Sequence, residues 1–100
     1  MRPRVPWMNE TDDAILEYFA ELEQSGFSPW EPPTAVWVNL VHNLETLDRT
    51  KPTVSRRMKK LASMGLLEKV DESRGYYRIT ELGLQYVQGD LGIEDIPRPE

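Results

Sequence analysis

The spacing of apolar residues changes close to Gly65 of this 100-residue chain. Before that glycine, apolar side chains recur roughly every three or four residues, which is the spacing of one face of an α-helix. After it come two short runs rich in strand-forming residues, 66–71 and 76–80, separated by the turn-forming residues 72–75. The order of these segments predicts a mainly α chain with one small β-hairpin, an α+β arrangement.

The first helix is predicted over residues 9–26. Asn9 or Thr11 can cap its N-terminus, two aspartates follow where the helix dipole favours negative charge, and Gly26 can end it. One stripe of this helix is expected to be buried, and it consists of Ile15, Leu16, Phe19 and Leu22.

Two further helices are predicted before the hairpin. Pro33 is well placed as the first residue of a helix over 33–44, because proline is tolerated where no backbone donor is needed. A third helix is expected over 51–64, with Thr50 as its N-cap and Gly65 just past its end. The apolar face of the second helix consists of Val36, Trp37, Leu40, Val41 and Leu44.

The chain is long enough for one small domain, and residues 1–90 are assigned to it. Residues 81–89 can form a last short helix after the hairpin, while the acidic, proline-ended tail 91–100 is expected to fray. No apolar run is long enough for a membrane span, and no apolar segment of a signal peptide follows the basic N-terminus. With no cysteine in the chain, a cytoplasmic protein is expected.

Positive charge is concentrated in one place. Residues 49–61 hold six of the 12 basic residues and no acidic one, although the whole chain has 17 acidic residues and a formal charge of −5. The rest of the chain therefore carries −11. A solvated helix face usually mixes both signs, so six like charges indicate a surface that meets an anion.

The third helix separates this charge from its apolar side. At about 100° per residue, Val54, Met58 and Leu61 share the core face. Arg56, Lys59 and Lys60 lie on the opposite side with Thr53, while Arg57 lies on the flank. Three helices, the third one basic, followed by a two-stranded ribbon is the order of a winged helix-turn-helix, in which the third helix enters the DNA major groove.

Residues 53–87, together with 7–19, resemble the haloarchaeal phage phi-H repressor-like winged-helix proteins. The segments 53–61 and 75–83 carry the more specific part of this likeness. The resemblance implies a sequence-specific transcriptional regulator that binds double-stranded DNA, expected to be a repressor of archaeal origin, and it explains the acidic composition as adaptation to molar salt. One departure is the segment 42–50, which is longer than the family's turn between the second and third helices.

The third helix and the hairpin supply the predicted DNA-binding residues. Thr53 and Arg56 are the best candidates for base contact, because arginine can donate two hydrogen bonds to guanine and a threonine methyl can touch thymine. Arg74, at the tip of the wing formed by 67–80, suits the minor groove or its phosphates, although it also fits a simple soluble turn. Lys51 is also a predicted DNA-binding residue, and the remaining predicted contacts are to phosphates, from Thr50, Ser55, Arg57, Lys59 and Lys60.

Other classes of function remain as alternatives. Catalysis and a metal site are not expected, because His42 is the only histidine and Asp12 and Asp13 are adjacent on a helix and so point to different faces. No cofactor or small-molecule ligand is predicted. The runner-up is a winged-helix protein-interaction module, and structured RNA is a further option. A homodimer is expected, because one recognition helix covers a single half-site.

Overall fold

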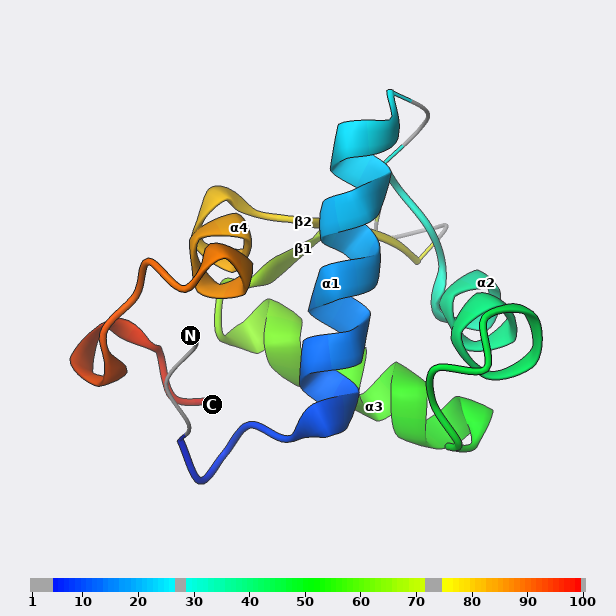
Figure 1. Ribbon diagram of the computed structural model, residues 1–100, viewed down its shortest axis with the longest axis horizontal. Helices are drawn as coiled ribbons and strands as arrows, with labels where there is room; N and C mark the ends of the chain where they lie inside the picture. Colours follow the sequence, from blue (N-terminus) through cyan, green and yellow to red (C-terminus); the bar gives the residue numbers. More distant parts are fainter. Residues whose placement is uncertain (1–4, 27–28, 72–74, 100) are drawn as a thin grey trace.

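Helix α1 (Glu10–Ser25) crosses the middle of the computed structural model, which describes residues 5–26, 29–71 and 75–99 (Figure 1). Asn9 is its N-cap and accepts from the backbone nitrogens of Thr11 and Asp12, while Gly26 ends the helix in the left-handed region at φ 81°. The helix packs against α3, α4, β2 and η1. Its predicted stripe is confirmed, because Ile15, Leu16 and Phe19 are fully buried and Leu22 is partly buried.

The second predicted helix is continuous but has two parts. It begins as α2 (Pro33–Trp37) and continues as a π-helix, η1 (Val38–Asn43), in which the hydrogen bonds span five residues. The Leu44 nitrogen, for example, donates to the Asn39 carbonyl at 2.8 Å. Pro33 is its first residue, as predicted. The expected apolar face is buried at Val36 and Leu40, whereas Leu44 is exposed beyond the end of the helix.

The expected β-hairpin is present. Strand β1 (Leu67–Asp71) pairs antiparallel with β2 (Tyr76–Ile79) from Leu67 opposite Ile79, and the register is irregular between Lys69 and Asp71. The connector before α2 adds to this sheet, because the backbone of Glu31 exchanges two 3.0 Å hydrogen bonds with Tyr77. The hairpin is thereby joined to the helical part of the molecule.

Helix α4 (Glu81–Gln88) closes the fold after the hairpin. Thr80 caps it by accepting from the Gly83 nitrogen at 3.0 Å, and Tyr86 is buried against the core, so the short helix predicted over 81–89 is present. The observed elements and the two-stranded antiparallel sheet confirm the predicted winged helix-turn-helix fold, mainly α with a small hairpin.

The C-terminal segment differs from the frayed tail that was expected. A short 3-10 helix, η2 (Ile93–Asp95), precedes Ile96, which is only 4% exposed. The indole nitrogen of Trp7 donates to the Pro97 carbonyl at 2.8 Å, and the Arg98 guanidinium lies 4.5 Å from the centre of the Trp7 ring. The tail is held because it contributes one buried apolar side chain and because an aromatic residue near the other end of the chain contacts it.

Candidate nucleic-acid interface

Helix α3 (Lys51–Ser63) is built as the sequence predicted. The Thr50 hydroxyl caps it by accepting from the Thr53 nitrogen at 3.4 Å, and Gly65 leaves it with φ 82°. Val54, Met58 and Leu61 are each 0% exposed, so the predicted core face is confirmed. The opposite side of the helix is therefore turned toward solvent.

Three cationic side chains of α3 extend into solvent without an internal partner. Lys51, Arg56 and Lys59 are exposed, and among the residues that the structure describes none accepts a hydrogen bond or an ion pair from their side-chain nitrogens. The hydroxyls of Thr50 and Thr53 lie beside them and are hydrogen-bonded to each other at 2.9 Å. This side of α3 combines free cations with small polar groups.

Arg57, in contrast, is held inside the molecule. Its Nε donates to Asp12 Oδ1 at 2.7 Å, and its Nη2 donates both to Asp12 Oδ2 and to the Trp7 carbonyl, the latter at 3.2 Å. Asp12 is fully buried and the Arg57 side chain is 22% exposed. The hydrogen bonds that Arg57 donates to Asp12 raise the pKa of Arg57, and the Asp12 carboxylate neutralises the charge of its guanidinium.

Lys60 contacts the same Trp7 carbonyl as Arg57. Its Nζ donates to the Trp7 oxygen, which also accepts from Arg57. Burial, followed by repulsion from Arg57, lowers the pKa of Lys60, although Asp12 acts in the opposite direction. Phosphate contacts were predicted for both residues, but the structure gives each of them an acceptor within the protein.

Arg49 lies just before α3 and also has an internal partner. Its Nη2 is 2.7 Å from Glu10 Oε1, and its Nη1 donates to the Asp48 carbonyl at 2.7 Å. Both side chains of the ion pair are well exposed, so the pair contributes at most about 1 kcal/mol to stability. Arg49 can therefore exchange Glu10 for another anion more easily than Arg57 can exchange Asp12.

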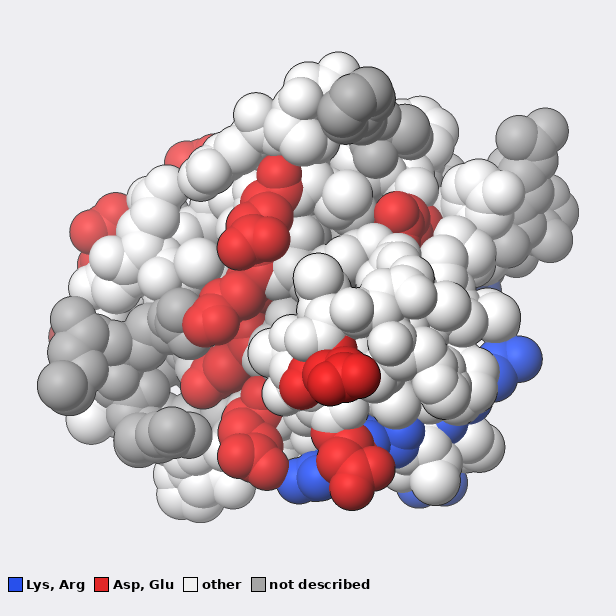
Figure 2. All heavy atoms as spheres, turned by 45° about the vertical axis from the view of Figure 1, so that its right-hand side comes forward, with Lys and Arg blue, Asp and Glu red and all other residues white. Residues whose placement is uncertain are grey.

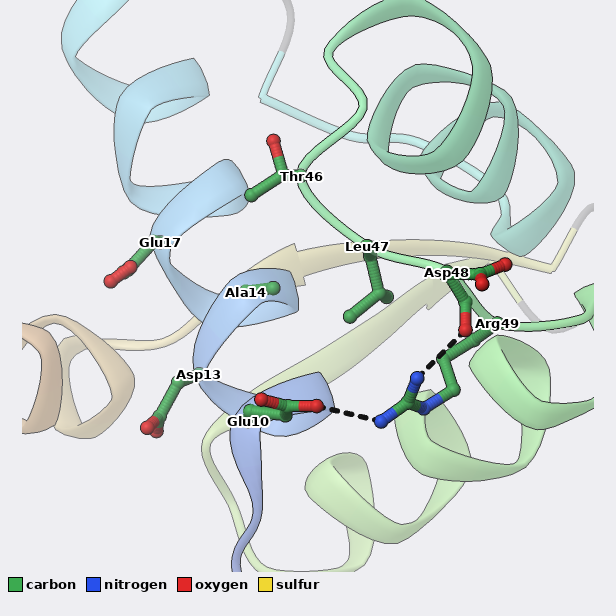
Figure 3. A pocket seen from close by; sticks show the side chains of 8 residues that line it. All are labelled: Glu10, Asp13, Ala14, Glu17, Thr46, Leu47, Asp48 and Arg49. Carbon is green, nitrogen blue, oxygen red and sulfur yellow. Dashed lines mark hydrogen bonds and ion pairs between the residues drawn. The ribbon is translucent and has the colours of Figure 1, made fainter.

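An acidic hollow borders the N-terminal end of α3. It has a volume of about 530 Å³ and lies between α1 and the segment that leads into α3, with the Arg49–Glu10 ion pair at one side (Figure 3). Its acidic lining residues are Glu10, Asp13, Glu17 and Asp48. Figure 2 shows the acidic side chains as a stripe along α1 and the basic ones gathered along the lower edge of the molecule. In this view most of the acidic stripe lies apart from the basic side chains, and the two signs of charge meet at the lower edge.

The wing is described only in part. Arg74, the predicted wing contact, lies outside the described residues. Within the strands, Arg78 pairs with Glu23 of α1 at 2.7 Å and lies 4.0 Å from Glu68. This arginine connects the hairpin to α1, so it differs in role from the exposed cations of α3.

Sequence reasoning missed the role of Asp12. An aspartate three residues after an Asn cap predicts the capping box that is observed, in which Asp12 Oδ2 accepts from the Asn9 nitrogen at 3.0 Å. The position of Arg57 on the flank of its helix, next to the core face, was the one available sign that it turns inward. The pairing itself joins residues 45 positions apart and leaves no local pattern.

Other kinds of site find little support in the described part of the chain. No group of three or more histidine, aspartate or glutamate side chains there is placed to hold a metal ion. His42 is exposed, and its ring packs edge-on against Trp37 with ring centres 4.8 Å apart. None of the helices in the described ranges has the length and apolar character needed to cross a membrane.

Comparison with known proteins supplies the family. Residues 1–98 match the model of the winged helix-turn-helix phage repressors. The chain is 29% identical over 99 residues to the repressor protein of Halobacterium phage phiH, covering 98% of this chain and 99% of that protein. It is also similar to the crystal structure of the PhiH1 repressor-like protein from Haloarcula marismortui, with 32% identity, a TM-score of 0.68 and coverage of 100% and 98% of the two chains. With its four-helix and two-stranded architecture, the chain belongs to the winged helix-turn-helix phage repressor family of DNA-binding regulators.

Proposed function

We propose that this protein represses transcription by binding a specific double-stranded DNA site, with α3 in the major groove. The observation that carries the proposal is the solvent side of α3, where Lys51, Arg56 and Lys59 are exposed and have no internal partner in the described structure. A helix fits the major groove, and its N-terminal residues reach base edges there. The likeness to a protein described as a repressor supports the direction of regulation.

The contacts divide by the chemistry of each side chain. Arg56 can donate two hydrogen bonds to guanine O6 and N7, and the methyl group of Thr53 can touch thymine. Lys51 and Lys59 suit phosphates, as do the hydroxyls of Thr50 and Ser55 near the positive end of the helix dipole. Residues 67–80 would act as the wing along the neighbouring backbone.

A homodimer is part of this proposal. One α3 covers a single half-site, and regulators of this architecture gain affinity and specificity by placing two recognition helices about one helical turn of DNA apart. The symmetry of the DNA site would then reflect the two-fold symmetry of the protein.

The alternative, a protein-interaction module, has less support. That function would favour mixed charge on α3 and an exposed apolar patch. The indole nitrogens of Trp7 and Trp37 instead donate to the backbone carbonyls of Pro97 and Arg49, whereas Trp30 is 40% exposed. Exposed acidic residues are absent from α3 itself.

The test begins with selection of bound duplexes from random DNA, followed by fluorescence anisotropy on the selected site. Arg56→Ala should weaken binding there by about 1–3 kcal/mol and relax discrimination at one base pair, because a bidentate base contact is lost. Lys59→Ala should weaken binding to all sequences about equally. If both variants bind as the parent protein does, α3 is not the DNA-contacting helix.

A further inference from the structure

The internal contacts of Arg57 are stronger than those of an ordinary surface arginine. Asp12 is completely buried and receives two hydrogen bonds from the guanidinium, and the Trp7 carbonyl accepts a third. A DNA phosphate could bind Arg57 only by displacing Asp12, which would leave a buried carboxylate without its partner. Such a state is strongly unfavourable, so Asp12 should hold Arg57 even beside DNA.

The two acceptors of Arg57, the Asp12 carboxylate and the Trp7 carbonyl, are themselves held in place. Asp12 belongs to the capping box of α1, where it accepts from the Asn9 nitrogen. Trp7 is fixed by its hydrogen bond to Pro97 and by the Arg98 guanidinium over its ring. The Trp7 carbonyl, which accepts from Arg57 and Lys60, therefore lies in an N-terminal segment that the C-terminal segment holds in place.

From this arrangement we propose that Asp12 is a positioning residue that acts through Arg57 and limits the number of phosphate contacts that α3 makes. Asp12 and the Trp7 carbonyl withhold Arg57 and Lys60 from DNA phosphates, so that α3 contacts DNA with Lys51, Arg56 and Lys59. Phosphate contacts raise affinity for every sequence alike, whereas base contacts distinguish sequences. Withholding two cations therefore lowers the affinity for all duplexes and the salt dependence of binding, and it leaves discrimination between sequences to the base contacts. The inference rests on the proposed function and adds a residue of α1 to it.

The first test compares salt dependence of binding. The slope of log K against log [salt] is negative, and each lost phosphate contact makes it shallower by about 0.9. Lys59→Gln should therefore flatten the slope by about that amount on a non-cognate duplex. The double variant Asp12→Asn with Arg57→Gln removes both charges of the buried pair and should leave the slope unchanged. Flattening of the slope by the double variant, to the same degree as by Lys59→Gln, would overturn the inference.

The single variant Asp12→Asn tests the gain of contact. With its carboxylate partner gone, Arg57 becomes available to phosphate, so the slope should steepen by about 0.9 and the affinities for cognate and non-cognate duplexes at low salt should rise about equally. The matched control is Glu21→Gln, which makes the same charge change at an exposed position of α1. An affinity and a slope that match those of Glu21→Gln would contradict the role of Asp12.

A third measurement needs no substitution, so it remains decisive if the Asp12 variants do not fold. The side-chain Nε–Hε resonances of the arginines are followed by NMR while cognate duplex is added to the full chain. The Arg56 signal should shift, and the Arg57 signal should stay in place and remain protected from solvent exchange. A shift of Arg57 like that of Arg56 would overturn this inference alone, whereas absence of binding to any duplex would overturn the proposed function and this inference with it.

Discussion

At the scale of single residues, Tyr18 joins three parts of the fold through one hydroxyl. It donates to Glu31 Oε1 at 2.5 Å and accepts from the Asn39 amide at 2.6 Å, so α1 is tied to the connector and to η1. Burial, followed by the hydrogen bond to Glu31 and its negative charge, raises the pKa of Tyr18 well above its ordinary value of 10.0. The folded protein therefore holds this proton at a pH where the unfolded chain has lost it.

The difference between the pKa of Tyr18 in the folded and unfolded states determines how stability depends on pH. Above pH 10 the folded state binds more protons than the unfolded state, so the free energy of unfolding falls as pH rises. One proton gives a slope of at most about 1.4 kcal/mol per pH unit. Tyr18→Phe should lack this contribution, and urea melts of both proteins from neutral pH to above pH 10 measure it. If the free energy of unfolding changes with pH in the same way in both proteins, folding does not raise the pKa of Tyr18.

The same scale shows what a sequence can and cannot reveal about one residue. Local chemistry predicted that Asp12 would favour the helix N-terminus, and it does so through the capping box. That Asp12 also neutralises Arg57 depends on how α1 crosses α3, which no pattern within either helix encodes. The exposed cations Arg56 and Lys59 were predictable because their side of α3 follows from helical spacing alone.

At the scale of elements, the packing of α4 against the strand depends on one glycine. A Cβ atom built on Gly83 would lie 2.3 Å from the Leu66 carbonyl oxygen and 2.6 Å from Ile79 Cγ1. Alanine normally stabilises a helix interior relative to glycine by about 1 kcal/mol, but here backbone atoms would have to move. Gly83→Ala should therefore destabilise the fold by roughly 1–3 kcal/mol, as measured by urea unfolding. A stability gain would mean that α4 packs less closely than described.

The helical elements were predicted well where caps and spacing act locally. Asn9, Thr50 and Pro33 marked the observed helix starts, and the change of spacing after Gly65 located the hairpin. The π-helical hydrogen bonding of η1 was not predicted, because the helical spacing of apolar residues over 33–44 fits an ordinary α-helix equally well. The backbone nitrogens of both Thr46 and Leu47 donate to the Leu40 carbonyl, so the long connection is anchored back onto the helix that it leaves.

At the scale of the whole molecule, the two ends of the chain support each other. Ile96 is 4% exposed and Ile93 is 57% exposed, although both belong to the tail that was expected to fray. Ile96→Ala should cost roughly 2–4 kcal/mol of stability, because a buried side chain is replaced by a cavity. Ile93→Ala, the same change in the same segment, should stay within about 0.5 kcal/mol of the parent. If both variants change the free energy of unfolding by a similar, negligible amount in urea melts, the tail is frayed, as the sequence predicted.

Charge is also distributed over the whole molecule. The chain has 17 acidic and 12 basic residues, and Glu10, Asp13 and Glu17 of α1 line a hollow that adjoins the start of α3. Repulsion among these carboxylates opposes folding, and repulsion between them and DNA phosphates opposes binding. At about 1 M salt the Debye length is only about 3 Å, so both effects are screened.

Salt should therefore act on folding and on binding in different ways. From about 0.1 to 2 M KCl the melting temperature should rise, because screening relieves the acidic surface. Over the same range the affinity for cognate DNA should fall, since each phosphate contact contributes a slope of about −0.9. Screening of the acidic face offsets part of that loss, so the measured slope should be shallower than the contacts alone require. Thermal melts and binding isotherms at matched KCl concentrations test both halves. A melting temperature that falls with salt, beside an undiminished binding slope, would refute adaptation to high salt and leave DNA binding intact.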